Sequence, residues 1–481
     1  MIRIARGAFV RASASALMSA SVVAPLSAKA AESETLDVTL TAKPLTFRPF
    51  PGVVSAGLAY NGSIPGPLLR IRHGQRLRAH FLNRTGSLST VHWHGMILPN
   101  VMDGVPYVTQ KPVRDGDEYL YEFVPGPPGS RWYHSHVGDQ LFQGLFGMII
   151  VDDVRDEPAD VDVALVFHDV PKRSTIRAAM RGVSTAPMVD PAGSPELLAM
   201  SPDDRMGDEV AYAAHCINGA CYPNVRPIVV RVGHRVRLRI LNANPTQTRY
   251  IRLGGHRLHV THSDGNPLPQ PIDVDALRVG VAERYDAWFE VTKPGAWLLQ
   301  GLAADPMAFE QAVVVHTPGM ENASPLGSPS ALEGVRFFTY ELAGAAGSPG
   351  SRPAAIPIDK RASYVLGGGK WASSRWTMNG KTWPHTQRIV VRRDDRVEVH
   401  FKNTTDMHHP MHLHGHVFEL VAMNGRALRY PLSKDVTLVD PNGGTATWRF
   451  AATSPPGRWV LHCHNDVHMM DGMMTEVDYM A

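Results

Sequence analysis

The sequence is poor in cysteine, in long apolar runs and in net charge, and each shortage excludes a class of protein. Three cysteines among 481 residues are too few for structural zinc sites, which prefer closed four-ligand sets rich in cysteine. No apolar run after residue 30 approaches the roughly 18 residues of a membrane span, so we expect no membrane span there. The formal net charge of +3 is small and argues against a nucleic-acid partner.

The first 30 residues are predicted to be a secretory signal. Arg3, Arg6 and Arg11 make a basic start, a small apolar stretch follows, and Ala-Lys-Ala at 28–30 fits a cleavage site. Removal of this segment deletes four basic residues and no acidic one, which takes the formal charge from +3 to −1. We therefore expect a periplasmic or secreted protein; a disordered N-terminal extension is the alternative.

Turn residues are plentiful, with 38 prolines and 42 glycines, and they separate short alternating segments. One pattern occurs three times: an Asn-Gly turn, a strand, a tight bend and a second alternating strand that ends at Asn. The turns begin at Asn61, Asn218 and Asn379, which are 157 and 161 residues apart. The repeating unit is therefore a whole domain rather than one turn of a solenoid.

Short alternating strands between turns predict an all-β chain of three consecutive Greek-key β-sandwich domains. We expect these domains over residues 34–155, 156–320 and 356–481. Residues 321–355 are rich in Pro, Gly, Ser and Ala and are predicted to be a linker that runs over the surface. Helix is expected to be scarce, with one turn over 195–200.

Histidine is concentrated in four His-x-His units. A strand projects both imidazoles of such a unit from one face, about 7 Å apart, which suits two adjacent metal ions. One unit alone is weak, because ordinary core or surface histidines would explain it. Eight imidazoles suit a cluster of three metals, two with three nitrogens each and one with two. The units are His92/His94, His134/His136, His412/His414 and His462/His464.

A second set of ligand types surrounds Cys463. On a strand its side chain faces away from the two neighbouring histidines, and the following turn can bring His468 and Met473 back beside it. A thiolate, a thioether and two imidazoles make a trigonal blue-copper site with a weak axial Met. We expect His409, which precedes the third His-x-His unit across a proline, to supply the second imidazole.

Twelve ligands and four metal ions account for these motifs with no remainder. One Cys among ten His, with a downstream Met, favours copper over zinc. His408 would face away from its neighbouring ligand, and His416 follows the glycine that ends its pair, so both are excluded. His256, His259 and His262 recur every three residues and would face alternate ways on a strand, so we expect them to be structural or solvated.

These motifs resemble those of the multicopper oxidases, the laccase-like family, over nearly the whole chain after the signal. Framework segments at 64–67, 102–106 and 283–286 are similar as well. The resemblance implies four copper ions and three cupredoxin-like domains, of which the middle one is a metal-free spacer that joins the other two. It implies a type 2 copper on His92 and His412, type 3 coppers on His94, His134 and His464 and on His136, His414 and His462, and a type 1 copper on His409, Cys463, His468 and Met473.

The resemblance also implies an enzyme in which a donor supplies single electrons at the type 1 copper. Cys463 would pass them through its neighbouring histidines to the cluster, where O2 is reduced to water. Protons would come from a nearby carboxylate. Asp103 matches a position where family members carry such an acid, although it could instead only shape the turn before Gly104. Some bacterial relatives place a Glu directly after the type 1 histidine, where this chain has Met469, and Asp466 is expected to substitute.

The electron donor is open at this point. Laccase-like members oxidise phenols and aromatic amines, and metallo-oxidase members oxidise Cu(I) or Fe(II). Thioethers and a carboxylate close to the type 1 ligands would suit a metal ion, yet a long Met-rich insert is missing, and we favour the laccase-like donors. The residues that favour Cu(I) are Met407, Met469, Met470, Met474 and Asp406.

Other functions carry less weight. A copper-sequestering protein would not need Cys463 between two cluster ligands, a catalytically dead scaffold would have lost ligands, and copper nitrite reductases are shorter. We expect a monomer whose partners are O2 and a small reductant. Cys216 and Cys221 form either a disulfide, which an exported protein allows, or two unpaired thiols.

Overall fold

The computed structural model describes residues 35–50, 52–172, 210, 212–302, 309–328, 334–345, 357–369 and 375–480. The predicted signal and the predicted helical turn over 195–200 lie outside these residues. No helix in the described part is long and apolar enough to cross a membrane.

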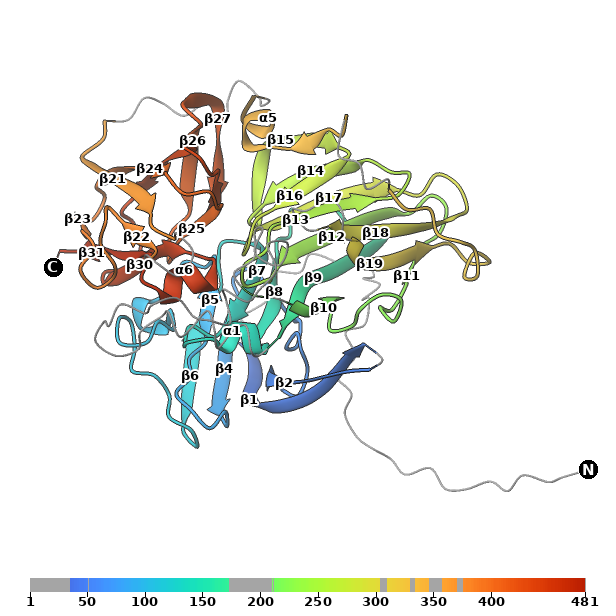
Figure 1. Cartoon of the computed structure of the whole chain (residues 1–481), viewed down its shortest axis with the longest axis horizontal. Helices are drawn as coiled ribbons and strands as arrows, with labels where there is room; N and C mark the ends of the chain where they lie inside the picture. The colour runs from blue at the N-terminus through green and yellow to red at the C-terminus, as the bar shows by residue number, and fades with distance from the viewer. Residues whose placement is uncertain are drawn as a thin grey trace, which may run out of the picture.

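Six β-sheets form three pairs in chain order (Figure 1), and we call these pairs the first, middle and third domains. In the first domain, one sheet has the strand order β2(Val53–Tyr60), β1(Thr35–Phe50), β4(Arg76–Asn83), β6(Glu118–Phe123). The other sheet has the order β3(Leu69–Arg72), β8(Phe146–Asp152), β7(Gly129–His134), β5(His92–His94). In the middle domain, one sheet has the strand order β10(Tyr212–Ile217), β9(Val161–Pro171), β12(Arg235–Asn242), β17(Arg284–Glu290), β14(Leu258–Ser263), β15(Asn266–Val274). The other sheet has the order β11(Ile228–Val229), β19(Phe309–His316), β18(Ala296–Leu302), β13(Arg249–Leu253), β16(Ala276–Val279), β20(Phe337–Phe338). In the third domain, one sheet has the strand order β22(Thr377–Met378), β21(Lys360–Gly367), β24(Arg396–Asn403), β29(Thr445–Ala451), β26(Phe418–Met423), β27(Arg426–Lys434). The other sheet has the order β23(Ile389–Val391), β31(Met474–Tyr479), β30(Arg458–Cys463), β25(His409–Leu413), β28(Val436–Val439). The prediction of an all-β chain is confirmed, while the numerical domain limits stay a prediction.

Helical segments in the described residues are short. They are η1(Asn100–Met102), α1(Gln140–Gln143), α5(Tyr340–Ala345) and α6(Asp466–Met470).

The threefold repeat has a common backbone. Asn61, Asn218 and Asn379 each have a φ near +50° (52°, 51° and 53°), a conformation that Asn tolerates better than other side chains. In each copy the Asn side-chain amide bonds to β1, β9 or β21: its Oδ1 accepts a main-chain N–H of that strand, and its Nδ2 donates to the carbonyl two residues before that N–H. The strands that follow, β4, β12 and β24, lie parallel to β1, β9 and β21.

The cores follow from strand alternation. In β4 and β24 every second side chain is buried and the others are wholly or partly exposed, as expected for a sheet with one solvated face. β12 is buried over nearly its whole length, and its two buried arginines, Arg237 and Arg239, are paired with Asp286 on β17.

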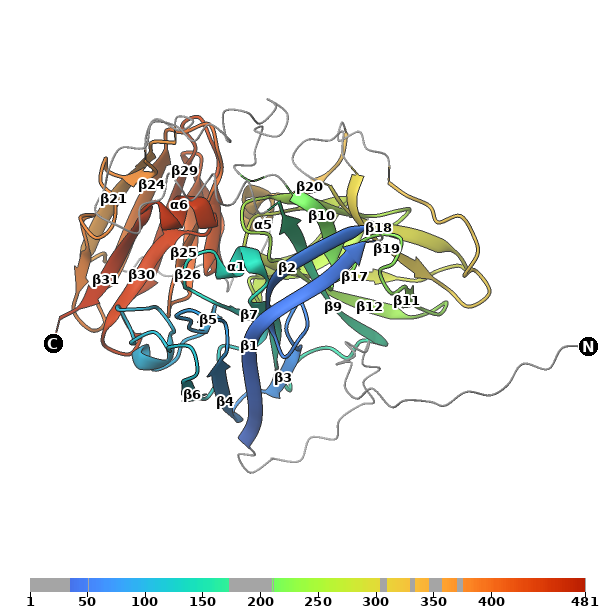
Figure 2. The same ribbon diagram turned by 60° about the horizontal axis from the view of Figure 1, so that its bottom comes forward.

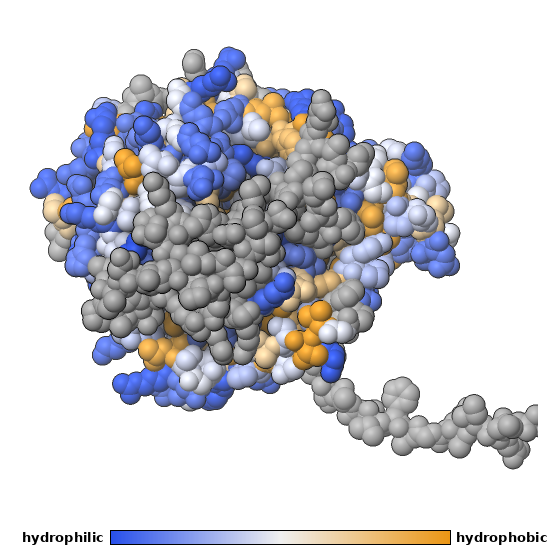
Figure 3. Space-filling view, in the orientation of Figure 1, coloured by the Kyte–Doolittle hydropathy of each residue, from blue (hydrophilic) through white to orange (hydrophobic). Residues whose placement is uncertain are grey.

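The first and third domains lie side by side in both views (Figure 1 and Figure 2), and they meet along β5, β7, β25 and β30. On the described part of the face in Figure 3, hydrophilic side chains predominate and hydrophobic ones form only small groups.

Part of the predicted surface linker is buried instead. α5 packs against β15 of the middle domain and β27 of the third, and Phe338 and Tyr340 are 1 % and 4 % exposed. The Tyr340 hydroxyl donates to Glu283 at 2.6 Å and accepts the Leu438 N–H at 3.0 Å. Tyr340 and α5 are therefore part of the contact between the middle and third domains.

Candidate metal centre

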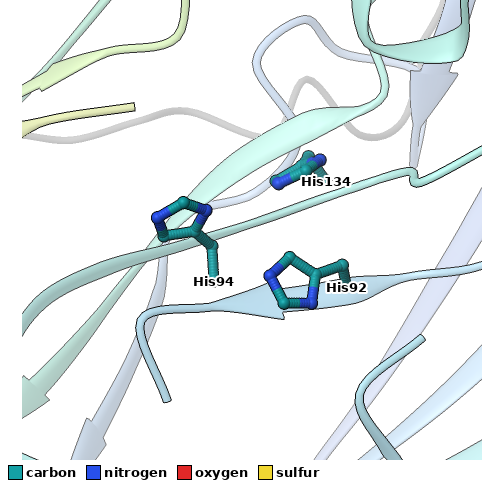
Figure 4. A group of neighbouring side chains, drawn as sticks. All are labelled: His92, His94 and His134. Carbon is teal, nitrogen blue, oxygen red and sulfur yellow. The ribbon is translucent and has the colours of Figure 1, made fainter. Parts of the chain in front are cut away.

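The four His-x-His units meet where the first and third domains face each other. β5 and β7 pair antiparallel with His92 opposite His134, and β25 and β30 pair with His412 opposite His462. Strand alternation sends both imidazoles of a unit to the same side. Figure 4 shows His92, His94 and His134 close together on neighbouring strands. None of the eight imidazoles is more than 7 % exposed.

Imidazoles of the two domains interleave at this interface. The rings of His92 and His414 stack with centroids 3.8 Å apart, and those of His94 and His412 with centroids 3.7 Å apart. His464 lies 5.0 Å from His94 between centroids. Sets whose ligand atoms all lie within 4.8 Å of one another are His92/His94/His134, His92/His412/His414 and His136/His414/His462.

Hydrogen bonds decide which nitrogen of each ring faces the shared space. Nδ1 of His134 lies 2.8 Å from the Ser135 carbonyl, and Nδ1 of His412 lies 2.7 Å from the Asp435 carbonyl. A carbonyl only accepts, so each Nδ1 carries the proton. Burial lowers the pKa of both rings well below 6.5, which leaves Nε2 with a lone pair. Among the described residues these Nε2 atoms have no hydrogen-bond partner.

The contact between His414 and His462 indicates a cation site in the cluster. The Nε2 atoms of His414 and His462 are 2.9 Å apart. The two Nδ1 atoms face acceptors, the Asp103 carboxylate at 2.9 Å and the Cys463 carbonyl at 2.9 Å. Both Nε2 atoms therefore present lone pairs to each other, an arrangement that a shared metal ion would stabilise.

Asp103 lies behind the cluster, where the sequence predicted an acid. It is fully buried, its Oδ2 faces His414, and its carbonyl lies 2.7 Å from Nδ1 of His92. Burial raises the pKa of Asp103, and the nearby His92 opposes this rise. Asp103 thus orients two imidazoles that come from different domains.

Asp435 was missed by the sequence reasoning. Its Oδ1 lies 3.1 Å from Nε2 of His94, so His94 is the one cluster imidazole among the described residues that meets a carboxylate through Nε2 and turns Nδ1 inward. The only signal was a charged pair, Lys434-Asp435, between two otherwise alternating strands. No motif spacing connects that pair to His94.

A second, smaller group lies within the third domain alone. Nδ1 of His409 and Nδ1 of His468 are 3.0 Å apart, and the Cys463 sulfur lies 3.5 Å and 3.3 Å from them. Nε2 of His409 lies 2.9 Å from the Thr405 hydroxyl, which itself donates to Asn403. That hydroxyl therefore accepts the proton of Nε2 and leaves Nδ1 of His409 as a ligand atom.

Helix capping brings His468 back to Cys463. The Asn465 side chain accepts the N–H groups of Val467 and His468 and starts α6. Met473, also fully buried, follows this helix, and its carbonyl accepts the Cys463 N–H at 3.0 Å. The main chain of Met473 therefore lies next to that of Cys463, and the axial role of its side chain stays a prediction.

Asp466, the other predicted acid, is at the start of α6 and 3 % exposed. Its N–H donates to the Pro245 carbonyl at 2.9 Å, which ties this helix to the middle domain. Burial, with a further contribution from Asp139, raises the pKa of Asp466 well above 3.8. An acid with a raised pKa therefore lies between two metal-ligand candidates in the chain, His464 and His468.

The remaining candidates lie apart from the two groups. His259 faces Asp273 at 2.8 Å and His256 faces the Gly254 carbonyl at 3.0 Å, so the middle-domain histidines have ordinary partners. His416 lies 2.7 Å from the Tyr479 hydroxyl. Cys216 and Cys221 form a disulfide.

A thiolate and imidazole nitrogens, with lone pairs directed at common points, form a donor set that suits copper. The fold and the site thus define a copper-dependent oxidoreductase of three cupredoxin-like domains. Family models described as multicopper oxidase match residues 43–156, 196–316 and 356–480.

Known proteins agree with this class. The chain is 33 % identical to multicopper oxidase MmcO of Mycobacterium tuberculosis, over 97 % of this chain and 92 % of that protein. It is 25 % identical to a copper resistance protein A homolog of Pseudomonas syringae pv. tomato, over 89 % of each chain. It is 28 % identical to laccase-4 of Thanatephorus cucumeris, over 85 % of this chain and 83 % of that one.

A solved multi-copper oxidase from Pseudomonas thermotolerans superposes with a TM-score of 0.70 at 25 % identity, over 93 % of this chain and 100 % of that chain. The chain belongs to the multicopper oxidase family.

Proposed function

We propose that this enzyme couples four one-electron oxidations of phenols or aromatic amines to the reduction of O2 to two waters. The observation that carries the proposal is the position of Cys463. Its sulfur lies with His409 and His468, while the neighbours on either side, His462 and His464, lie with imidazoles of the first domain. We infer that adjacent residues at the end of β30 join a donor site to an oxygen site.

Four bound copper ions would accept electrons one at a time from the donor and deliver them to O2. We assign His92 and His412 to a type 2 copper, as the family resemblance implies. The mutual approach of His136, His414 and His462 and of His94, His134 and His464 supports two type 3 sites. His409, Cys463, His468 and Met473 would hold the type 1 copper.

Protons for water formation would come from the two buried acids. Asp103 contacts His414 directly, and burial raises the pKa of both Asp103 and Asp466. A carboxyl group with a raised pKa holds a proton at a pH where an exposed one would have lost it. We propose that these groups hold protons next to the cluster and release them during turnover.

A cuprous or ferrous metallo-oxidase is the second candidate, and the thioethers near the type 1 ligands favour it. Met407, Met469 and Met470 are partly buried and Met474 is 9 % exposed. Soft thioether ligands suit Cu(I), and one relative is named for copper resistance. Another relative is named a laccase, which favours the organic donors.

O2 uptake by the copper-loaded protein distinguishes the two donors. The test compares 2,6-dimethoxyphenol with Cu(I) under the same conditions. Fast uptake with the phenol alone supports the laccase-like assignment, and fast uptake with Cu(I) alone supports the metallo-oxidase. If copper binds and neither donor drives uptake, the oxidase proposal fails and copper storage replaces it. We further propose that the chain is exported to the periplasm or beyond and acts as a monomer.

A further inference from the structure

Among the described residues, the middle domain supplies no histidine to either group, yet it contacts the segment of the third domain that supports the cluster. The segment is the bend Lys434–Val436 between β27 and β28. Asp264 and Arg284 of the middle domain bond to it, and all of these side chains are fully buried. A buried charge is retained only where it is well paired, and each of these charged groups has a partner of opposite charge.

Arg284 holds both oxygens of Asp435. Its Nη1 donates to Oδ1 and its Nη2 donates to Oδ2, each at 2.6 Å. The same guanidinium donates to the carbonyls of Ser130 and Asp264 at 3.2 and 3.0 Å. A guanidinium bound in this two-pronged way fixes both the position and the rotation of a carboxylate.

Asp264 holds the backbone of the same bend. Its Oδ2 accepts the N–H groups of Val436 and Asp435 at 3.1 and 3.3 Å and the ammonium group of Lys434 at 2.9 Å. Three donors on one oxygen leave the bend little freedom to move. The middle domain therefore fixes the main chain of Asp435 through Asp264 and its side chain through Arg284.

Asp435 in turn supports one imidazole from each of the other two domains. Its Oδ1 faces Nε2 of His94 at 3.1 Å, and its carbonyl faces Nδ1 of His412 at 2.7 Å. These two rings stack at 3.7 Å. The first of these bonds determines that His94 presents Nδ1, and the second that His412 presents Nε2.

Gly95 gives an independent indication that this contact is built closely. It directly follows His94 and has a φ of +77°. A Cβ placed there would come within 2.6 Å of both Arg284 Nη2 and Asp435 Oδ2. The ion pair is therefore packed against the backbone that carries His94, with no room for another side chain.

We propose that Arg284 and Asp264 are positioning residues of the cluster, and that through Asp435 they fix the orientation of His94 and His412. The middle domain is then part of the oxygen site rather than a spacer. This inference rests on the proposed function, since it assumes that the eight imidazoles bind copper.

The test compares Arg284→Lys with Arg239→Lys. Arg239 is a matched control: it is a buried middle-domain arginine that binds Asp162 through two nitrogens at 2.7 and 3.1 Å. Among the described residues it bonds neither to Asp435 nor to a cluster histidine. Lysine keeps the charge and loses the two-pronged geometry at both positions. The readouts on the full-length protein are unfolding, the blue absorption of the Cys463 site and loss of copper to a competing chelator.

We expect both variants to unfold more easily and both to keep the blue absorption. Only Arg284→Lys should lose cluster copper more readily, by about 10- to 100-fold in affinity, the usual cost of removing a group that orients a metal ligand. Equal copper retention in the two variants would overturn the proposal.

Asp435→Asn keeps the test decisive if Arg284→Lys does not fold. The substitution is nearly isosteric and replaces one acceptor oxygen by a donor, so it should release cluster copper while the blue absorption persists. Wild-type copper retention in Asp435→Asn would contradict the proposal. Failure of the proposed oxidase is seen separately, in a wild-type protein that binds copper and consumes no O2.

Discussion

The two metal-site candidates are built in different ways. The Cys463 group takes all its side chains from the third domain, within residues 409–473, and a capped helix folds the chain back on itself to complete it. The eight-histidine group takes half of its imidazoles from each of two domains and depends on bonds such as the one between Asp103 and His414, 311 residues apart. One site is a local fold of the chain, and the other is a property of a domain interface.

This difference predicts that substitutions at the domain interface will affect the two sites differently. The local site should tolerate changes at the interface, because its ligands do not cross it. The interface site should respond to any residue that sets how the domains meet. The variants below separate these two behaviours, beginning with the largest expected effect.

Cys463→Ser should abolish O2 uptake with every donor, because the link between donor site and oxygen site is lost. The blue absorption should vanish, since it requires the thiolate. The eight imidazoles are untouched, so the cluster should still bind copper, which metal analysis and spin resonance would measure. Uptake that persists in this variant would show that electrons reach the cluster by another route.

Asp103→Asn should lower the O2-reduction rate by about 10- to 100-fold, because Asp103 orients His92 and His414. The blue absorption should stay at its wild-type strength, since no Cys463-site ligand touches Asp103 in the described residues. Asp103→Glu, which keeps the acid, is the matched variant. A fall in both the blue absorption and the rate would contradict the separation of the sites.

Copper removal should make stability depend steeply on pH. Burial, with help from neighbouring imidazoles, lowers the pKa of six cluster histidines well below 6.5: His94, His134, His412, His414, His462 and His464. The unfolded chain then binds more protons than the folded one, so the free energy of unfolding is highest above pH 6.5 and falls as the pH drops from there towards the folded-state pKa values. Each such group contributes about 1.4 kcal/mol per pH unit.

Denaturant unfolding of the copper-free protein at pH 7, 6 and 5 would measure this slope. The copper-loaded protein should hold its stability to lower pH, because protons must first displace the metal. His416, whose pKa burial lowers to about 4, belongs to neither site and should contribute equally in both forms. Identical slopes with and without copper would argue that these imidazoles are not ligands.

Met473→Leu should have the smallest effect. A thioether at the axial position stabilises oxidised copper, so its loss should raise the reduction potential of the Cys463 site. The rate should change by about tenfold or less, and the cluster should be unaffected. Redox titration of the blue absorption would measure the shift, and an unchanged potential would remove Met473 from the ligand set.

The division between a locally built site and an interface site also explains which features the sequence could predict. The all-β fold and the threefold repeat could be read because Asn61, Asn218 and Asn379 recur in equivalent local patterns. The His-x-His spacing identified residues that the structure brings together, since a strand fixes the direction of such side chains whatever the rest of the fold does.

What the sequence did not predict are the residues that act across long separations. Asp435 meets His94 from 341 residues away, and Arg284 meets Asp435 from 151 residues away. Their identity depends on how three domains pack, and no local period encodes that packing. Tyr340 was misplaced on the surface for the same reason, because its partner Glu283 belongs to another part of the chain.

The ratio of donor oxidised to O2 consumed tests the central claim most directly. The oxidation of 2,6-dimethoxyphenol would be followed by its absorbance, while an oxygen electrode records O2 uptake and a peroxidase assay detects hydrogen peroxide. If the Cys463 site feeds the eight-histidine cluster, four one-electron oxidations should accompany each O2, with no peroxide released. Two oxidations per O2, with one equivalent of peroxide, would contradict it.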